Sequence, residues 1–163
     1  MAGQQVVGLR EKPLRALRAA HLGMVFQEGE LVGELDAVEN VALPLLLRGV
    51  RPEPARHAAH ELLDRLGVPT EGVPAERMSG GERQRTALGR ALIGRPALVL
   101  ADEPTGALDT DTRDEVADLV FEWCAKLNTA LLVVTHDPVV AARAGRSVTL
   151  DGGVLHETSA PVR

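Results

Sequence analysis

Residues 97–103 read ALVLADE, an aliphatic run that ends in two adjacent carboxylates, Asp102 and Glu103. Nearly continuous aliphatic runs are typical of parallel strands that are covered on both faces. Side chains alternate along a strand, so at its end one acid can face a metal ion while the next faces a different neighbour. In a simpler interpretation, the acidic pair only closes the strand and begins a turn.

The flanking sequence alternates further short β-rich runs with longer helical patterns, which indicates an α/β fold with a mostly parallel sheet. We expect additional strands at residues 5–9, 22–26 and 130–135. Residues 147–150 and 154–157 flank an Asp-Gly-Gly sequence, and this pattern predicts a closing hairpin because glycine supplies the positive φ of a tight turn.

Helical periodicity is clearest over residues 53–66 and 110–127, and a further helical run covers 86–93. Residues 36–77 read as a small helical insert between sheet-forming parts. One side of the 110–127 helix carries a row of apolar residues, and we expect this face to pack on the sheet. The row consists of Val116, Leu119, Val120, Trp123 and Leu127.

Length and composition favour one globular domain, since the 163 residues are 45% hydrophobic and 25% charged. The net charge of -5 and the scarcity of aromatic residues disfavour a nucleic acid as a partner. The single cysteine, Cys124, fits a reducing, cytosolic setting. The longest wholly apolar stretch, residues 41–47, is far shorter than the roughly 20 residues that cross a bilayer, so any membrane role is expected to involve a partner.

Residues 78–85 read MSGGERQR, and Ser79 with Glu82 has the spacing of a capping box that begins a helix. The capping box does not explain Gly80 and Gly81, which expose backbone N–H groups and let an anion approach a helix N-terminus. A helix dipole contributes only about 0.3–1 kcal/mol in exposed settings, so phosphate binding requires a second surface. The pattern therefore favours a phosphate contact that is made jointly with a partner.

Polar side chains also end two other predicted strands. Gln27 follows residues 22–26, and His136 follows residues 130–135. Ligands of open α/β sheets bind at the carboxyl edge, so we expect Gln27, Asp102, Glu103 and His136 to meet there. Each residue also has a simpler interpretation, because a lone histidine is usually structural and a glutamine that leaves a strand is usually solvated.

In combination and order, these residues resemble the nucleotide-binding subunits of ABC transporters. Gln27 is similar to the Q-loop, residues 79–82 to the signature, residues 102–103 to the Walker B acids, residues 107–109 to the D-loop and His136 to the switch histidine. Residues 39–45, 103–109 and 135–137 most resemble the branch that works with lipoprotein-release and macrolide-export permeases.

The resemblance implies a P-loop NTPase-like, RecA-like core in a single ATPase domain, residues 1–163, with a helical and signature subdomain at about 36–96. It also implies ATP and Mg²⁺ as ligands. Asp102 and Gln27 would hold Mg²⁺, Glu103 would act as general base, and His136 would contact the γ-phosphate. Residues that would act across to a second ATPase subunit, in a homo- or heterodimer, are Ser79, Gly80, Gly81, Glu82 and Asp109.

The same resemblance implies that a membrane permease is the other partner, which residues 28–39 would meet. The subunit would then be cytoplasmic and peripheral on the inner face of the cell membrane. A DNA-repair or chromosome-organising relative is a further alternative, but such proteins usually insert long segments between the Q-loop and the signature, and Gln27 and Ser79 lie close in sequence.

The sequence departs from the family pattern in two ways. Met78 and Glu82 replace the usual Leu and Gln of the signature, and no G-x-x-x-x-G-K-[ST] phosphate loop is present. We therefore expect an N-terminally truncated domain that binds ATP weakly, hydrolyses little and exposes apolar surface on its sheet. A catalytically incompetent subunit, which supplies its signature in trans to a complete partner, is the alternative.

Overall fold

The computed structural model describes residues 3 and 5–158. Strands β1 (Leu22–Val25), β2 (Leu98–Asp102) and β3 (Ala130–Val134) form a parallel sheet in the order β1-β2-β3. Strands β4 (Ser147–Asp151) and β5 (Val154–Thr158) form the expected antiparallel hairpin, and Gly152 and Gly153 in its turn both have positive φ. The predicted α/β fold with a parallel sheet is confirmed.

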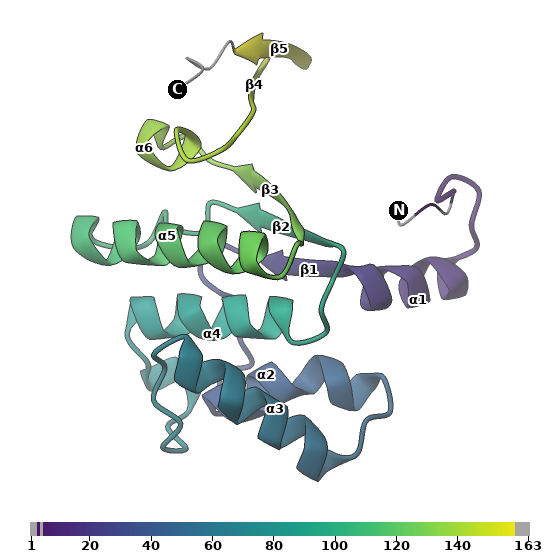
Figure 1. The fold of residues 1–163 in the computed structure, drawn as a ribbon, viewed down its shortest axis with the longest axis vertical. Coiled ribbons are helices and arrows are strands. Elements are labelled where there is room, and N and C mark those ends of the chain that lie inside the picture. Colours follow the sequence, from purple (N-terminus) through teal and green to yellow (C-terminus); the bar gives the residue numbers. More distant parts are fainter. Residues whose placement is uncertain (1–2, 4, 159–163) are drawn as a thin grey trace.

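Helices occupy the connections between the parallel strands. Between β1 and β2 the chain forms α2 (Ala37–Leu47), α3 (Pro52–Arg65), the short 3-10 helix η1 (Ala75–Arg77) and α4 (Gly80–Leu92). Helix α5 (Thr110–Lys126) joins β2 to β3, and the short α6 (Pro138–Ala141) follows β3. In Figure 1, α4 lies between α5 and the pair formed by α2 and α3.

The core is aliphatic and centres on α4, which packs against α2, α3, α5 and β1. Close approach is possible where glycine faces a neighbouring element: a Cβ on Gly23 of β1 would lie 2.5 Å from the carbonyl oxygen of Ala91 in α4. The expected apolar face of α5 packs on β3 and α4, with Val116, Val120 and Trp123 buried. The prediction for this helix is confirmed.

The prediction of a strand at residues 5–9 is wrong. These residues form turns and irregular backbone, with Gly8 at φ +86° and a turn hydrogen bond from the Leu9 amide to the Val6 carbonyl. A β-rich composition forms a strand only where a neighbouring strand offers pairing and burial, and Val7 is almost fully exposed. Helix α1 (Glu11–His21) follows and projects away from the sheet (Figure 1). The sequence did not predict it, because a helix that buries only Leu17 carries little apolar periodicity.

None of the helices in residues 5–158 is both long and apolar enough to cross a membrane.

Candidate functional site

The carboxyl ends of the three parallel strands lie side by side. Val25 pairs with Ala101, and Asp102 pairs with Val134, so the strands stop within one residue of a common row. The residues that follow directly are Phe26 and Gln27, Glu103, and Thr135 and His136. The polar residues expected from the sequence to share one edge of the sheet are therefore brought to that edge.

Glu103 connects two of these strand ends. Its carboxylate Oε1 accepts a hydrogen bond from the His136 amide at 2.8 Å and lies 2.7 Å from Nδ1 of the His136 ring. Its Oε2 accepts a hydrogen bond from the Thr135 hydroxyl at 3.1 Å. Its backbone has φ +43°, a left-handed conformation that a non-glycine residue rarely adopts, and its amide donates to the Val134 carbonyl. Strained backbone of this kind clusters at functional sites, where the surrounding contacts maintain it.

These contacts set the protonation of the pair. Partial burial of Glu103 by itself raises the pKa of its carboxyl, but hydrogen bonds from the His136 ring, the His136 amide and Thr135 outweigh this and lower the pKa below its ordinary value. The hydrogen bond to Glu103 in turn raises the pKa of the His136 imidazole, and the nearby carboxylate charges act in the same direction. The pair therefore favours a carboxylate beside a protonated imidazole.

Asp102 and Gln27 lie at the same edge and are both exposed. Within residues 5–158 the Asp102 carboxylate makes no hydrogen bond or ion pair, so its oxygens are available to a cation. The Gln27 amide packs against Gly106, where a Cβ would come within 3.1 Å of Nε2. One carboxylate and one amide oxygen, supplemented by substrate phosphates, are ligands that suit Mg²⁺. The donor set thus fits the ion that the sequence implies.

Ser79 begins α4 with the predicted capping box. Its hydroxyl oxygen accepts a hydrogen bond from the Glu82 amide, and the Glu82 carboxylate accepts one from the Ser79 amide at 2.8 Å. The hydrogen bond with the Ser79 backbone is the largest cause that lowers the pKa of Glu82. The two glycines also have a packing role that was not foreseen. A Cβ on Gly80 would lie 3.0 Å from Leu108, and one on Gly81 would lie 2.7 Å from Thr112.

Gln84 was missed by sequence reasoning, although it joins α4 to two strand ends. It is buried, and its amide nitrogen donates to the carbonyls of Phe26, Gln27 and Pro104 at 2.8, 3.2 and 2.6 Å. Its signal in the sequence is a neutral amide on the face of α4 that otherwise carries buried small and apolar residues. A hollow of about 500 Å³ lies beside it, lined among others by Gln27, Gly80 and Leu108.

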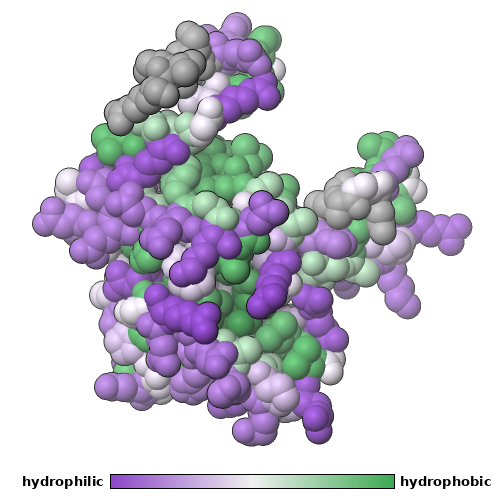
Figure 2. Space-filling model, viewed as in Figure 1, coloured by the Kyte–Doolittle hydropathy of each residue, from purple (hydrophilic) through white to green (hydrophobic). Residues whose placement is uncertain are grey.

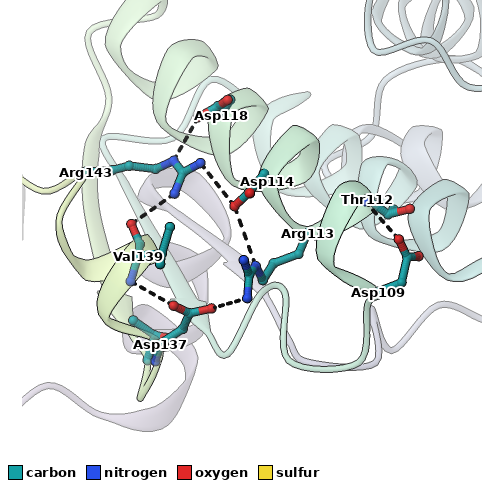
Figure 3. A network of polar contacts seen from close by, with 9 residues as sticks. Asp109, Thr112, Arg113, Asp114, Asp118, Asp137, Val139 and Arg143 are labelled. Atoms are coloured by element: carbon teal, nitrogen blue, oxygen red, sulfur yellow. Dashed lines mark hydrogen bonds and ion pairs between the residues drawn. The ribbon is translucent and has the colours of Figure 1, made fainter.

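Asp109 begins α5 and accepts a hydrogen bond from the Thr112 amide at 3.1 Å, which lowers the pKa of the Asp109 carboxyl. One turn along α5, Arg113 forms an ion pair with Asp137, the residue after His136, at 3.1 Å (Figure 3). The Val139 amide is the first cause, and Arg113 a further one, that lowers the pKa of Asp137. Sequence reasoning did not identify these charges.

Comparison with known proteins agrees with this geometry. The family model described as "ABC transporter" matches residues 3–106. The uncharacterized ABC transporter ATP-binding protein YbbA of Escherichia coli K12 is 45% identical over 159 residues, which cover 96% of this chain and 69% of that protein. The lipoprotein-releasing system ATP-binding protein LolD of Alcanivorax borkumensis is 44% identical over 156 residues, which cover 95% and 68%.

Solved structures give the same result. The dimeric ATP-binding cassette MJ0796 bound to ADP and Pi superposes with a TM-score of 0.83 at 31% identity, over 96% of this chain and 71% of the cassette. The fold is therefore that of a P-loop NTPase-like α/β core with attached helices. The chain belongs to the ABC transporter family, as an ATP-binding subunit of the ABC ATPase type.

Proposed function

We propose that the strand-end cluster is the water-activating part of an ATP site, in a subunit that drives a permease of the lipoprotein-release type. Because these 163 residues contain no phosphate loop, they bind ATP weakly and hydrolyse little by themselves. The observation that carries this proposal is the Glu103 carboxylate, which His136 and Thr135 hold at the edge of the sheet beside Asp102. LolD proteins at 43–45% identity support the finer assignment to the lipoprotein-release branch.

Glu103 acts as general base in this proposal, because an ionised carboxylate fixed by three hydrogen bonds can accept a proton from an attacking water. His136 contacts the γ-phosphate through its exposed ring and holds the water. Asp102 and Gln27 hold Mg²⁺, which neutralises charge on the phosphates when bound. These roles of Glu103 and His136 require both side chains at the same edge of the sheet. The hydrogen bonds between the two residues support this arrangement.

The signature residues act in trans. The N-terminus of α4 offers the exposed Ser79 and the backbone of Gly80 and Gly81 to the nucleotide of a second ATPase subunit. Glu82 contributes by holding Ser79 in the capping box, and Asp109 couples the two sites. The dimeric state of the MJ0796 cassette supports a paired arrangement. In the same proposal, residues 36–96 form the helical subdomain of a single domain, since α2, α3 and α4 pack on one another.

The permease is the proposed membrane partner, and residues 28–39 form the contact with it. This assignment puts the subunit at the cytoplasmic face of the membrane. Gln84 and Arg90 of α4 hold the beginning of this segment through the carbonyls of Gln27, Gly29 and Glu30. Movement of α4 would therefore displace the start of the segment that meets the permease.

An NMR titration of the ¹⁵N-labelled chain with ATP, with and without Mg²⁺, tests the site and tolerates weak binding. We expect the amide signals of Gln27, Glu103 and His136 to shift together on addition of Mg-ATP. Asp102→Asn should weaken the Mg²⁺-dependent part of binding by roughly tenfold or more, because it removes a charged ligand. Arg56→Met, which breaks an exposed ion pair with Glu39, is the matched control.

Two outcomes would contradict the proposal: no change of the amide signals at the strand ends, or the same Mg²⁺ dependence of binding in the Asp102→Asn variant.

The role of the signature in trans has a separate test. Sedimentation of the chain mixed with LolD of Alcanivorax borkumensis should show Mg-ATP-dependent association that Ser79→Arg abolishes. Association that does not depend on Mg-ATP, or that persists in the Ser79→Arg variant, would refute the role of the signature.

A further inference from the structure

The first turn of α5 holds the loop that carries His136 through a charged contact. Nη1 of Arg113 lies 3.1 Å from Oδ2 of Asp137, and both side chains are partly buried, 25% and 17% exposed. Oδ1 of the same aspartate accepts a hydrogen bond from the Val139 amide at 2.8 Å and so caps α6. One carboxylate thus connects the start of α6 to the start of α5 (Figure 3).

The contact is part of a continuous series of polar interactions between two parts of the candidate site. At one end, the Arg113 amide donates to the carbonyl of Asp109 at 2.8 Å. At the other end, the Asp137 amide donates to the Thr135 hydroxyl at 3.0 Å, and that hydroxyl donates to Glu103. The Arg113–Asp137 pair is the side-chain link in this series between α5 and the His136 loop.

Arg143 makes a second set of polar contacts between α5 and α6. The Arg143 guanidinium donates to Asp118 and Asp114 of α5 and to the Val139 carbonyl. Asp114 also lies 3.5 Å from Nε of Arg113, an ion pair without a hydrogen bond. The Arg113 guanidinium therefore lies near two carboxylates, those of Asp114 and Asp137.

We propose that Arg113 is a positioning residue: its ion pair with Asp137 fixes the His136 loop to the first turn of α5, so that Asp109 and His136 are held in one rigid unit. The proposal deepens the function given above and rests on it for the roles of Asp109 and His136. The physical link between the two segments is independent of those roles.

Amide hydrogen exchange of the full chain, measured by NMR without nucleotide, tests the link. The amides to follow are those of His136 and Val139, which donate to Glu103 and Asp137. Arg113→Met should accelerate their exchange by about three- to tenfold, as expected for loss of one partly buried ion pair. Arg113→Lys keeps the positive charge, so the exchange rates of these amides should stay within about twofold of those in the unsubstituted chain.

A double-mutant cycle separates the ion pair from a general loss of stability. Asp137→Asn keeps an oxygen to cap α6 but removes the charge, so adding Arg113→Met to it should produce no further acceleration. Arg56→Met makes the same change at a distant exposed pair and should leave both amides unaffected.

Unchanged exchange at His136 and Val139 in Arg113→Met would overturn the proposal. Equal acceleration of the β3 amides that face β2, those of Leu132 and Val134, would also overturn it, because the residue would then act only on global stability. Failure of Mg-ATP binding would affect the proposed function alone, since the exchange experiment contains no nucleotide.

Discussion

Glu103 concentrates several constraints in one residue. Its left-handed backbone turns the chain away from β2 directly after Asp102, while its carboxylate reaches the residues that follow β3. Conformations of this kind cost of order 1–3 kcal/mol and persist only where neighbouring contacts enforce them. The hydrogen bonds from Thr135 and His136 provide such contacts, so the geometry of the candidate base and its neighbour are mutually dependent.

The contact between His136 and Glu103 should depend on pH. Glu103 raises the pKa of His136 above 6.5, and His136 contributes to lowering the pKa of Glu103 below 4.5, so the contact stabilises the fold fully between these two values. The contribution is lost as pH rises through the raised pKa of His136 or falls through the lowered pKa of Glu103. An NMR titration of the His136 ring should show this raised pKa, and Glu103→Gln should bring it down. An unchanged His136 pKa in that variant would contradict the contact.

Gly81 should be intolerant of a side chain for reasons of packing. A Cβ would lie 2.7 Å from Cγ2 of Thr112, so Gly81→Ala should lower the free energy of unfolding by about 1–3 kcal/mol. Thr112→Ser removes Cγ2 and should recover most of this loss when combined with Gly81→Ala. Urea unfolding measures both effects.

Gly145→Ala is the matched control for this prediction, because a Cβ there would meet no atom within 4 Å. Its effect should stay within about 0.5 kcal/mol. If Thr112→Ser fails to rescue Gly81→Ala, the clash is not the cause of the loss.

Helix α4 links the elements of the site to one another. Its N-terminus presents Ser79, while Gln84, one and a half turns further along, holds carbonyls at the ends of β1 and β2. Gly23 allows β1 to approach the same helix closely. Displacement of α4 therefore cannot occur without disturbing both strand ends.

Gln84→Met should reveal how much this link contributes. The substitution keeps the size of the side chain but leaves the buried Pro104 carbonyl without a donor, whereas the Phe26 carbonyl still accepts from the Gly29 amide; we expect a loss of about 1–3 kcal/mol in the free energy of unfolding. Thermal or urea unfolding provides the measurement. Gln5→Met, at an exposed position, is the control, and equal stability of the two variants would exclude a role for the hydrogen bonds.

Local patterns predicted much of the fold and part of the site. The aliphatic runs at β1, β2 and β3, the capping box at Ser79 and the Asp-Gly-Gly hairpin each carry their signal within a few residues. The shared edge followed from the rule that parallel strands end together. The proposed chemical roles of the residues at that edge stay predictions.

Features that depend on distant neighbours could not be predicted in this way. Gln84 bonds residues 57 and 58 positions earlier, and Arg113 pairs with an aspartate on another connection. The error at residues 5–9 has the same origin, because β-propensity does not reveal whether a pairing strand is present. Helix α1 could not be predicted from apolar periodicity, because it buries so little apolar surface.

At the scale of the whole molecule, apolar surface is exposed on β3 and on the β4–β5 hairpin. Leu132 and Val134 are 53% and 58% exposed, and Leu150 and Leu155 are exposed on the hairpin. Figure 2 shows hydrophobic surface in the region above α5 where β3 lies. Within residues 5–158, β3 pairs only with β2, so its outer edge also offers unpaired backbone groups.

We therefore expect this 163-residue polypeptide to self-associate as its concentration rises. Light scattering should detect the increase in mass, and a Leu132→Thr, Val134→Thr double variant should reduce it while retaining β-propensity. Replacing Leu47, an exposed leucine on α2, by Thr is the control for the loss of apolar surface elsewhere. A chain that stays monomeric at all concentrations would contradict the expectation.

Trp123 gives the molecule a built-in optical reporter. It is the only tryptophan in the sequence, it is almost fully buried on α5, and the Lys126 ammonium lies 4.8 Å from its ring centroid. Intrinsic fluorescence at tryptophan excitation therefore comes from the helix that begins at Asp109 and carries Arg113. A red shift of the emission would follow solvation of that helix without any label on the protein.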